Sequence, residues 1–266
     1  MASEDEDDGA FAVSEDLVQS PAHKTAGTST IDFDGLLEPP LKLHEDLSGG
    51  CGGQLWPAGM VLTKYLLRNH STALQRSSMF MFSLAVALGC QLDKPVYITD
   101  QQPMFELMER NITLNNLQAK VRACIFDWGS SVPVDVPQYP DIILAADCVY
   151  FEPAFPLLQQ TLQDVIGPAT VCYFCFKKRR RADLHFMKAV RKSFDVEEID
   201  DLGRAAYSRE NIFLLVARCG LQGSRHRLLS KTDTPSEEGF LKVELEWATT
   251  QNANWCCMAK SLECRS

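Results

Sequence analysis

Three apolar runs of the sequence end in side chains that could bind a ligand or position a reactive amine. Asp100 ends the run PVYITD, Asp127 and Trp128 follow the run VRACIF, and Asp147 ends the run DIILAAD, three residues before Tyr150. An ionised carboxylate only accepts hydrogen bonds, so Asp100 could accept two from a ribose diol. The indole of Trp128 could stack on a flat base. The acid and the phenol of the D-x-x-Y sequence could bracket an amine.

Structural roles compete with these interpretations. Asp100 could instead cap the helix that Pro103 opens, and Trp128 could cover the hydrophobic core. The D-x-x-Y pattern is also weak by itself. Position favours the functional interpretation, because three successive strand ends would bring these groups to one edge of a parallel sheet, where ligands bind.

The elements that must position these groups alternate along the chain from residue 95 onward. Apolar runs without polar alternation are typical of strands buried on both faces, and such strands between helices predict a mostly parallel, doubly wound α/β sheet. The expected strands cover residues 95–100, 121–126, 142–146, 170–176 and 211–217, and the expected helices cover residues 57–68, 103–115, 154–165 and 181–194.

Composition divides the chain into three parts. The formal net charge is −9, and residues 1–16 contribute −7 of it, so the remainder is close to neutral at −2. We expect residues 1–40 to form an acidic disordered tail, residues 41–220 to form one folded domain, and residues 221–266 to form a poorly ordered extension. A near-neutral body gives no electrostatic reason to expect nucleic acid or a membrane as partner. The absence of an apolar run of 18 residues also favours a soluble protein.

The cysteines and the basic run each have a plain interpretation. The ten cysteines lie scattered in apolar runs, which favours reduced thiols in the cytoplasm, and Cys172 and Cys175 would point to opposite faces of one strand. No histidine has partners at the spacing of metal ligands, so we expect no metal. The basic run at residues 177–181 could bind nucleic acid or an acidic protein surface, but a solvated loop and helix face is favoured.

A set of short motifs resembles one known family. LWPAG at residues 55–59, YITD ending at Asp100, FDWG at residues 126–129 and AADCVY at residues 145–150 occur in the order found in the seven-β-strand, S-adenosylmethionine-dependent protein lysine methyltransferases of the small non-histone group. KKRRRADLHF at residues 177–186 is similar to the fungal branch whose substrate is translation elongation factor 1-alpha. The resemblance implies a Rossmann-like class I methyltransferase fold and S-adenosyl-L-methionine as cofactor. We also expect a cytoplasmic, monomeric enzyme.

The resemblance also implies roles for six residues. Four would contact the cofactor: Trp56 lines its pocket, Asp100 binds the ribose hydroxyls, Trp128 flanks the adenine and Ala146 lies against the cofactor. Asp147 and Tyr150 would lie at the substrate lysine. Transfer of a methyl group from a sulfonium to a neutral amine needs mainly alignment, a dry slot and a route for the amine proton. The family therefore needs no catalytic triad and no metal cluster.

One departure from the family pattern affects the cofactor site. The family has its first strand and a glycine-rich loop before residue 95, but residues 68–88 contain no glycine. We therefore expect the sheet to lack this central strand, unless residues 79–82 replace it rather than begin the next helix. The sequence could reflect a truncated gene model, a divergent working site, or a catalytically inactive methyltransferase fold that acts as an interaction protein. A protein-lysine N-methyltransferase acting on elongation factor 1-alpha is the favoured function.

Overall fold

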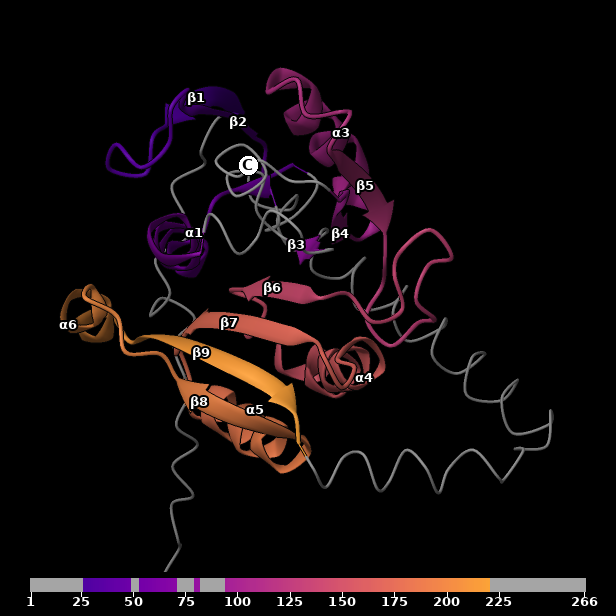
Figure 1. Ribbon diagram of the computed structural model, residues 1–266, viewed down its shortest axis with the longest axis vertical. Coiled ribbons are helices and arrows are strands. Elements are labelled where there is room, and N and C mark those ends of the chain that lie inside the picture. Colours follow the sequence, from indigo (N-terminus) through magenta and orange to yellow (C-terminus); the bar gives the residue numbers. More distant parts are fainter. Residues whose placement is uncertain (1–25, 49–52, 71–78, 82–93, 221–266) are drawn as a thin grey trace, which may run out of the picture. The chain divides into compact units, whose positions relative to one another are not determined.

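The computed structural model describes residues 26–48, 53–70, 79–81 and 94–220 (Figure 1). The chain divides into two compact units, Met1–Cys219 and Gly220–Ser266. All the helices and strands below belong to the first unit. The extension predicted over residues 221–266 lies outside the described residues.

A seven-stranded sheet forms the centre of the first unit, with the strand order β5-β4-β3-β6-β7-β9-β8. The strands are β3 (Met79–Met81), β4 (Val96–Asp100), β5 (Val121–Ile125), β6 (Ile142–Ala146), β7 (Val171–Lys177), β8 (Phe194–Glu198) and β9 (Ile212–Cys219). β5, β4, β3, β6 and β7 run parallel, and β9 runs antiparallel to both β7 and β8. The prediction of a mostly parallel sheet is confirmed.

Helices cover both faces of this sheet, as predicted. α1 (Pro57–Asn69) and α3 (Phe105–Leu114) contribute to the core on one face, while α4 (Phe155–Val165) and α5 (Arg181–Ser193) contribute to the core on the other. Short helical segments complete the unit: η4 (Gln102–Met104), η5 (Glu152–Ala154), α6 (Arg204–Tyr207) and η6 (Ser208–Glu210). α1 begins with Pro57, whose missing N–H costs nothing in a first turn.

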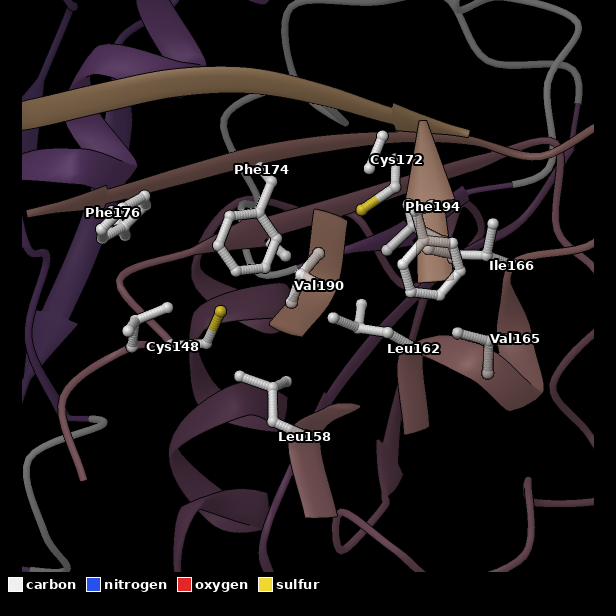
Figure 2. Packing of buried hydrophobic residues seen from close by; sticks show 14 of the residues in the cluster. Cys148, Leu158, Leu162, Val165, Ile166, Cys172, Phe174, Phe176, Val190 and Phe194 are labelled. Carbon is white, nitrogen blue, oxygen red and sulfur yellow. The ribbon is translucent and has the colours of Figure 1, made fainter. Parts of the chain in front are cut away.

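Successive side chains of a buried strand point to opposite faces of the sheet, so each such strand contributes to both cores. Leu144 of β6 belongs to the core under α1, whereas Ile143 belongs to the core under α4 and α5. On β7, Cys175 belongs to the first core and Cys172 to the second, so the expectation that these thiols point to opposite faces is confirmed. Figure 2 shows Cys172 and Cys148 among the apolar side chains of the second core.

Of the two alternatives for the central strand, its replacement by residues 79–82 is the one that the structure shows, over Met79–Met81. β3 lies between β4 and β6 and pairs with both in parallel: Met79 is opposite Val96 and Ile142, and Met81 is opposite Ile98 and Leu144. The physical reason is that the facing backbone groups of β4 and β6 would otherwise lack hydrogen-bond partners inside the protein. Residues 82–93, which follow β3, lie outside the described residues.

The prediction of a tail over residues 1–40 is wrong for its last part, and residues 1–25 lie outside the described residues. β1 (Gly27–Ile31) pairs antiparallel with β2 (Leu41–Glu45), and the loop between them buries Phe33 and Leu37. β1 carries polar Thr and Ser side chains that stay exposed, so it has no apolar pattern to reveal it. Among the described helices, none is long and apolar enough to cross a membrane.

Candidate functional site

The carboxyl ends of β4, β5 and β6 bring the predicted residues to one edge of the sheet. Asp100 is the last residue of β4 and Ala146 the last residue of β6, while Trp128 follows the end of β5. β4 and β5 are also joined beyond their ladder, because Phe126 N donates to the carbonyl oxygen of Asp100 over 3.0 Å. The edge that sequence order suggested therefore exists in the structure.

Asp100 is a partly buried carboxylate with spare capacity to accept hydrogen bonds. Within the described part of the chain, its one donor is the backbone N–H of Gln101, at 2.8 Å. Burial raises the pKa of Asp100 above its ordinary value; the hydrogen bond from Gln101 opposes this shift, and the neighbouring carboxylate of Asp127 adds to it. The helix-cap alternative is excluded, because η4 has Gln101 at its N-cap and no side-chain cap.

Trp128 is held by a tight turn beside Asp100. Gly129 has a φ of 82°, which a residue with a side chain rarely adopts, and a Cβ there would lie 2.7 Å from Cδ2 of Leu157. Its N–H donates to Oγ1 of Thr161 on α4 over 2.8 Å. The side chain of Gln101 adds a bond to Asp127, with 3.2 Å between Nε2 and Oδ1. The indole of Trp128 is partly buried against the core under α4.

Asp147 is a buried carboxylate that ties three elements together. Its Oδ2 accepts a 2.8 Å hydrogen bond from the N–H of Ala58, in the first turn of α1. Its Oδ1 accepts from the N–H of Lys177 at 3.3 Å and from Nη1 of Arg179 at 3.1 Å. Trp56, the N-cap of α1, provides no side-chain cap, so Asp147 supplies the acceptor that the helix start needs.

Arg179 and Arg180 extend this arrangement from the end of β7. The guanidinium carbon of Arg179 lies 5.6 Å from the centroid of the Trp56 ring, within the range of a cation–π contact. Oδ2 of the fully buried Asp183 accepts from the N–H groups of Arg179 at 2.8 Å and Arg180 at 2.9 Å. The guanidinium of Arg180 donates to the carbonyl oxygen of Tyr150.

These contacts correct two interpretations of the sequence. The basic run is not merely a solvated face, because Arg179 and Arg180 hold Asp147 and Tyr150 in place. The acid and phenol of the D-x-x-Y sequence also differ in environment: the side chain of Asp147 is 3 % exposed, whereas Tyr150 is 41 % exposed. Asp147 is a positioning residue in this structure, and Tyr150 presents its ring at the surface.

Arg179 was the functional residue that sequence reasoning missed. The signal was its place two residues after a buried strand, on the same edge as Asp147. The described residues contain no group of three His, Cys, Asp or Glu side chains that could hold a metal ion.

The comparisons with known proteins agree with this arrangement. A family model described as lysine methyltransferase matches residues 36–193, which include all six predicted site residues. The chain belongs to the lysine methyltransferase family. The sheet described above is accordingly a Rossmann-like class I methyltransferase fold, and the protein is a protein-lysine N-methyltransferase that acts on a protein substrate.

The chain is also similar to individual proteins. The chain is 34 % identical over 238 residues to the Protein-lysine N-methyltransferase EFM6 of Saccharomyces cerevisiae, covering 76 % of this chain and 96 % of the yeast protein. It is 34 % identical over 105 residues to the EEF1A lysine methyltransferase 3 of Mus musculus, covering 38 % of this chain and 45 % of the mouse protein. A solved structure of M. jannaschii TYW2 in complex with AdoMet is 13 % identical, with a TM-score of 0.45, over 73 % of this chain and 84 % of that one.

Proposed function

We propose that this chain transfers a methyl group from S-adenosylmethionine to a lysine of translation elongation factor 1-alpha, in the cytoplasm. The observation that carries the proposal is the convergence of Asp100, Trp128 and Ala146 with the Asp147–Arg179 pair at one edge of the sheet. The printed name of the mouse relative, which specifies an EEF1A lysine, supports the choice of substrate.

The residues at the adenosine end of the proposed site fit the cofactor. Asp100 keeps acceptor capacity at a partly buried position, as recognition of a ribose diol requires, and Trp128 offers a partly buried indole to flank the adenine. Ala146 ends β6 with a small, partly buried side chain that packs against the core under α1. S-adenosylmethionine supplies the electrophilic methyl group when it is bound.

The residues at the substrate end hold and orient the lysine rather than activate it chemically. Asp147 fixes the start of α1 against the end of β7, and Arg179 packs over Trp56 from the same side. Because these contacts hold the side chains at the substrate end in one geometry, the amine can be aligned for in-line attack. Tyr150 is 41 % exposed, so water beside its ring can take the amine proton.

Calorimetric titration of the full chain with S-adenosylmethionine tests the cofactor part of the proposal. We expect binding that Asp100→Asn weakens, whereas Glu106→Gln, which alters an exposed carboxylate on α3, leaves it unchanged. Methylation of purified elongation factor 1-alpha, followed by mass spectrometry of its lysines, tests the substrate. If the chain does not bind the cofactor, the proposed enzymatic activity is wrong. If it methylates other proteins but not elongation factor 1-alpha, only the proposed substrate is wrong.

The glycine-free segment at residues 68–88 favours a second candidate, an inactive methyltransferase fold that binds the same partner. This candidate predicts that the full chain captures elongation factor 1-alpha equally well with or without S-adenosylmethionine. It also predicts that Asp100→Asn does not change the capture. Turnover that depends on the cofactor would eliminate it.

A further inference from the structure

Three basic side chains lie at the edge of the candidate site. Lys178, Arg180 and Arg181 follow β7 directly, and we call them the basic rim. Their neighbours in sequence are engaged: Arg179 pairs with Asp147, and Nζ of Lys177 lies 4.0 Å from Oε2 of Glu210. In the part of the chain that the structure describes, no salt bridge involves the basic rim.

Buried contacts fix the turn that carries the basic rim. Asp183, which is fully buried, accepts hydrogen bonds from the backbone of Arg179 and Arg180 and so sets the turn that precedes α5. The side chain of Arg180 reaches the backbone oxygen of Tyr150, which places this arginine beside the exposed phenol ring. The charge of Arg180 is therefore presented next to Tyr150, and Lys178 and Arg181 lie within two residues of it in the sequence.

We infer that the basic rim is a docking surface for an acidic segment of the protein substrate, so that the enzyme selects lysines that are flanked by Asp or Glu. This inference rests on the proposed function, because the substrate lysine must approach the same edge. A lysine ammonium by itself is repelled by Lys178, Arg180 and Arg181, whereas a segment with acids beside the lysine is attracted. The rim therefore favours substrate lysines that have acidic neighbours over lysines that have none.

A protein segment fits the basic rim better than RNA does. Binding of nucleic acid uses many phosphate contacts, whereas the rim offers three charges and the chain outside residues 1–16 is close to neutral at −2. The acids Glu152 and Glu210, next to the rim, would repel a phosphate backbone that ran past it. A short acidic peptide needs no more contacts than the three charges of the rim.

The chain offers a charge-matched control away from the site. α5 starts at the basic rim and leads to β8, which runs parallel to β7, so the end of α5 lies toward the opposite edge of the sheet. Arg191 is ten residues from Arg181 along α5, which corresponds to about 15 Å. Lys120 precedes β5 at that opposite edge. Lys120→Gln, Arg191→Gln and Lys192→Gln together remove three charges and leave the rim intact.

The experiment compares two labelled peptides that differ only in the residues around one lysine, Asp and Glu in the first and Asn and Gln in the second. Fluorescence anisotropy with the full chain at about 0.15 M salt, where the screening length is about 8 Å, measures both affinities. The wild type is expected to prefer the acidic peptide by about tenfold, from three rim charges that each contribute modestly. Lys178→Gln, Arg180→Gln and Arg181→Gln together should abolish this preference, and the control triple should keep it.

Each outcome separates this inference from the proposed function. Equal binding of both peptides to the wild type, or equal losses in the rim and control variants, overturns the docking surface. A single-stranded RNA oligonucleotide that binds in place of the acidic peptide, and is lost in the rim variant, assigns the surface to nucleic acid and also overturns it. If elongation factor 1-alpha is not methylated, the proposed function fails while the peptide comparison still decides the docking surface.

Discussion

Replacing Asp147 with asparagine tests whether this carboxylate holds the substrate end of the site together. Asn and Asp are nearly equal in size, and both tolerate the left-handed backbone that Asp147 adopts, with a φ of 51°. The change therefore removes the charge and one acceptor without adding backbone strain. Any effect can be attributed to the three hydrogen bonds of the carboxylate.

The expected loss of unfolding free energy in Asp147→Asn follows from the hydrogen-bond donors around this carboxylate. If the amide oxygen of Asn turns toward Lys177 N and Arg179 Nη1, the amide nitrogen faces the N–H of Ala58 and leaves this buried donor without an acceptor. An unsatisfied buried donor costs about 1–3 kcal/mol. The lost charge pair adds at most about 1 kcal/mol, because the side chain of Arg179 is 31 % exposed and can be hydrated. We expect a loss of about 2 kcal/mol of unfolding free energy, or a fall in Tm of about 4–8 °C.

Urea denaturation of the wild type, Asp147→Asn and the control Asp195→Asn measures this loss. Asp195 lies exposed on β8, so its variant should stay within about 0.5 kcal/mol of the wild type. Arg179→Met and the double variant complete a thermodynamic cycle, in which we expect a coupling of about 0.5–1 kcal/mol. An Asp147→Asn variant as stable as the control would refute the view that Asp147 ties α1 to β7.

Three further changes test other parts of the site. Burial raises the pKa of Asp100 in the folded protein, so ionisation of this carboxyl lowers the free energy of unfolding as the pH rises through the raised pKa. Asp100→Asn should therefore be at least as stable as the wild type at neutral pH. This advantage should vanish in thermal melts at a pH below about 4, and a constant difference would contradict it. Gly129→Ala should cost about 2–4 kcal/mol in urea, more than Gly35→Ala, because both have positive φ but only the first Cβ meets Leu157. Tyr150→Ala should reduce methylation about tenfold or more while Tm stays unchanged, because the ring is 41 % exposed, and Tyr150→Phe reports on the hydroxyl alone.

The sequence predicted the elements that bury apolar runs, and it missed those that do not. β6 was expected over residues 142–146 and occupies Ile142–Ala146. An unbroken apolar run bounded by polar residues predicts both the presence and the ends of a buried strand. β8 was not predicted, since its residues from Asp195 to Glu198 are mostly exposed at the edge of the sheet. β1 was missed for the same reason. Exposed edge strands are formed by their neighbours more than by their own pattern.

The site could be predicted as a set of positions but not as a set of contacts. The strand-end rule correctly brought Asp100, Trp128 and Asp147 to one edge. The hydrogen bond between Asp147 and Ala58 joins residues 89 positions apart, and no local pattern signals it. A run of basic residues likewise does not reveal which of its members turn inward. Arg179 does so because the buried Asp183 holds its backbone, and burial of Asp183 depends on the packing of α5.

The short central strand explains how the two halves of the site can form although residues 68–88 contain no glycine. β3 pairs on one side with β4, which carries Asp100, and on the other with β6, which leads into Asp147. Its last residue, Met81, is level with Ile98 and Leu144, two residues before Asp100 and Ala146. Parallel ladders to both neighbours are enough to hold them in register, so the adenosine and lysine ends are set by the flanking strands. The missing glycines should therefore affect the affinity for the methionine end of the cofactor, and not the assembly of the residues around it.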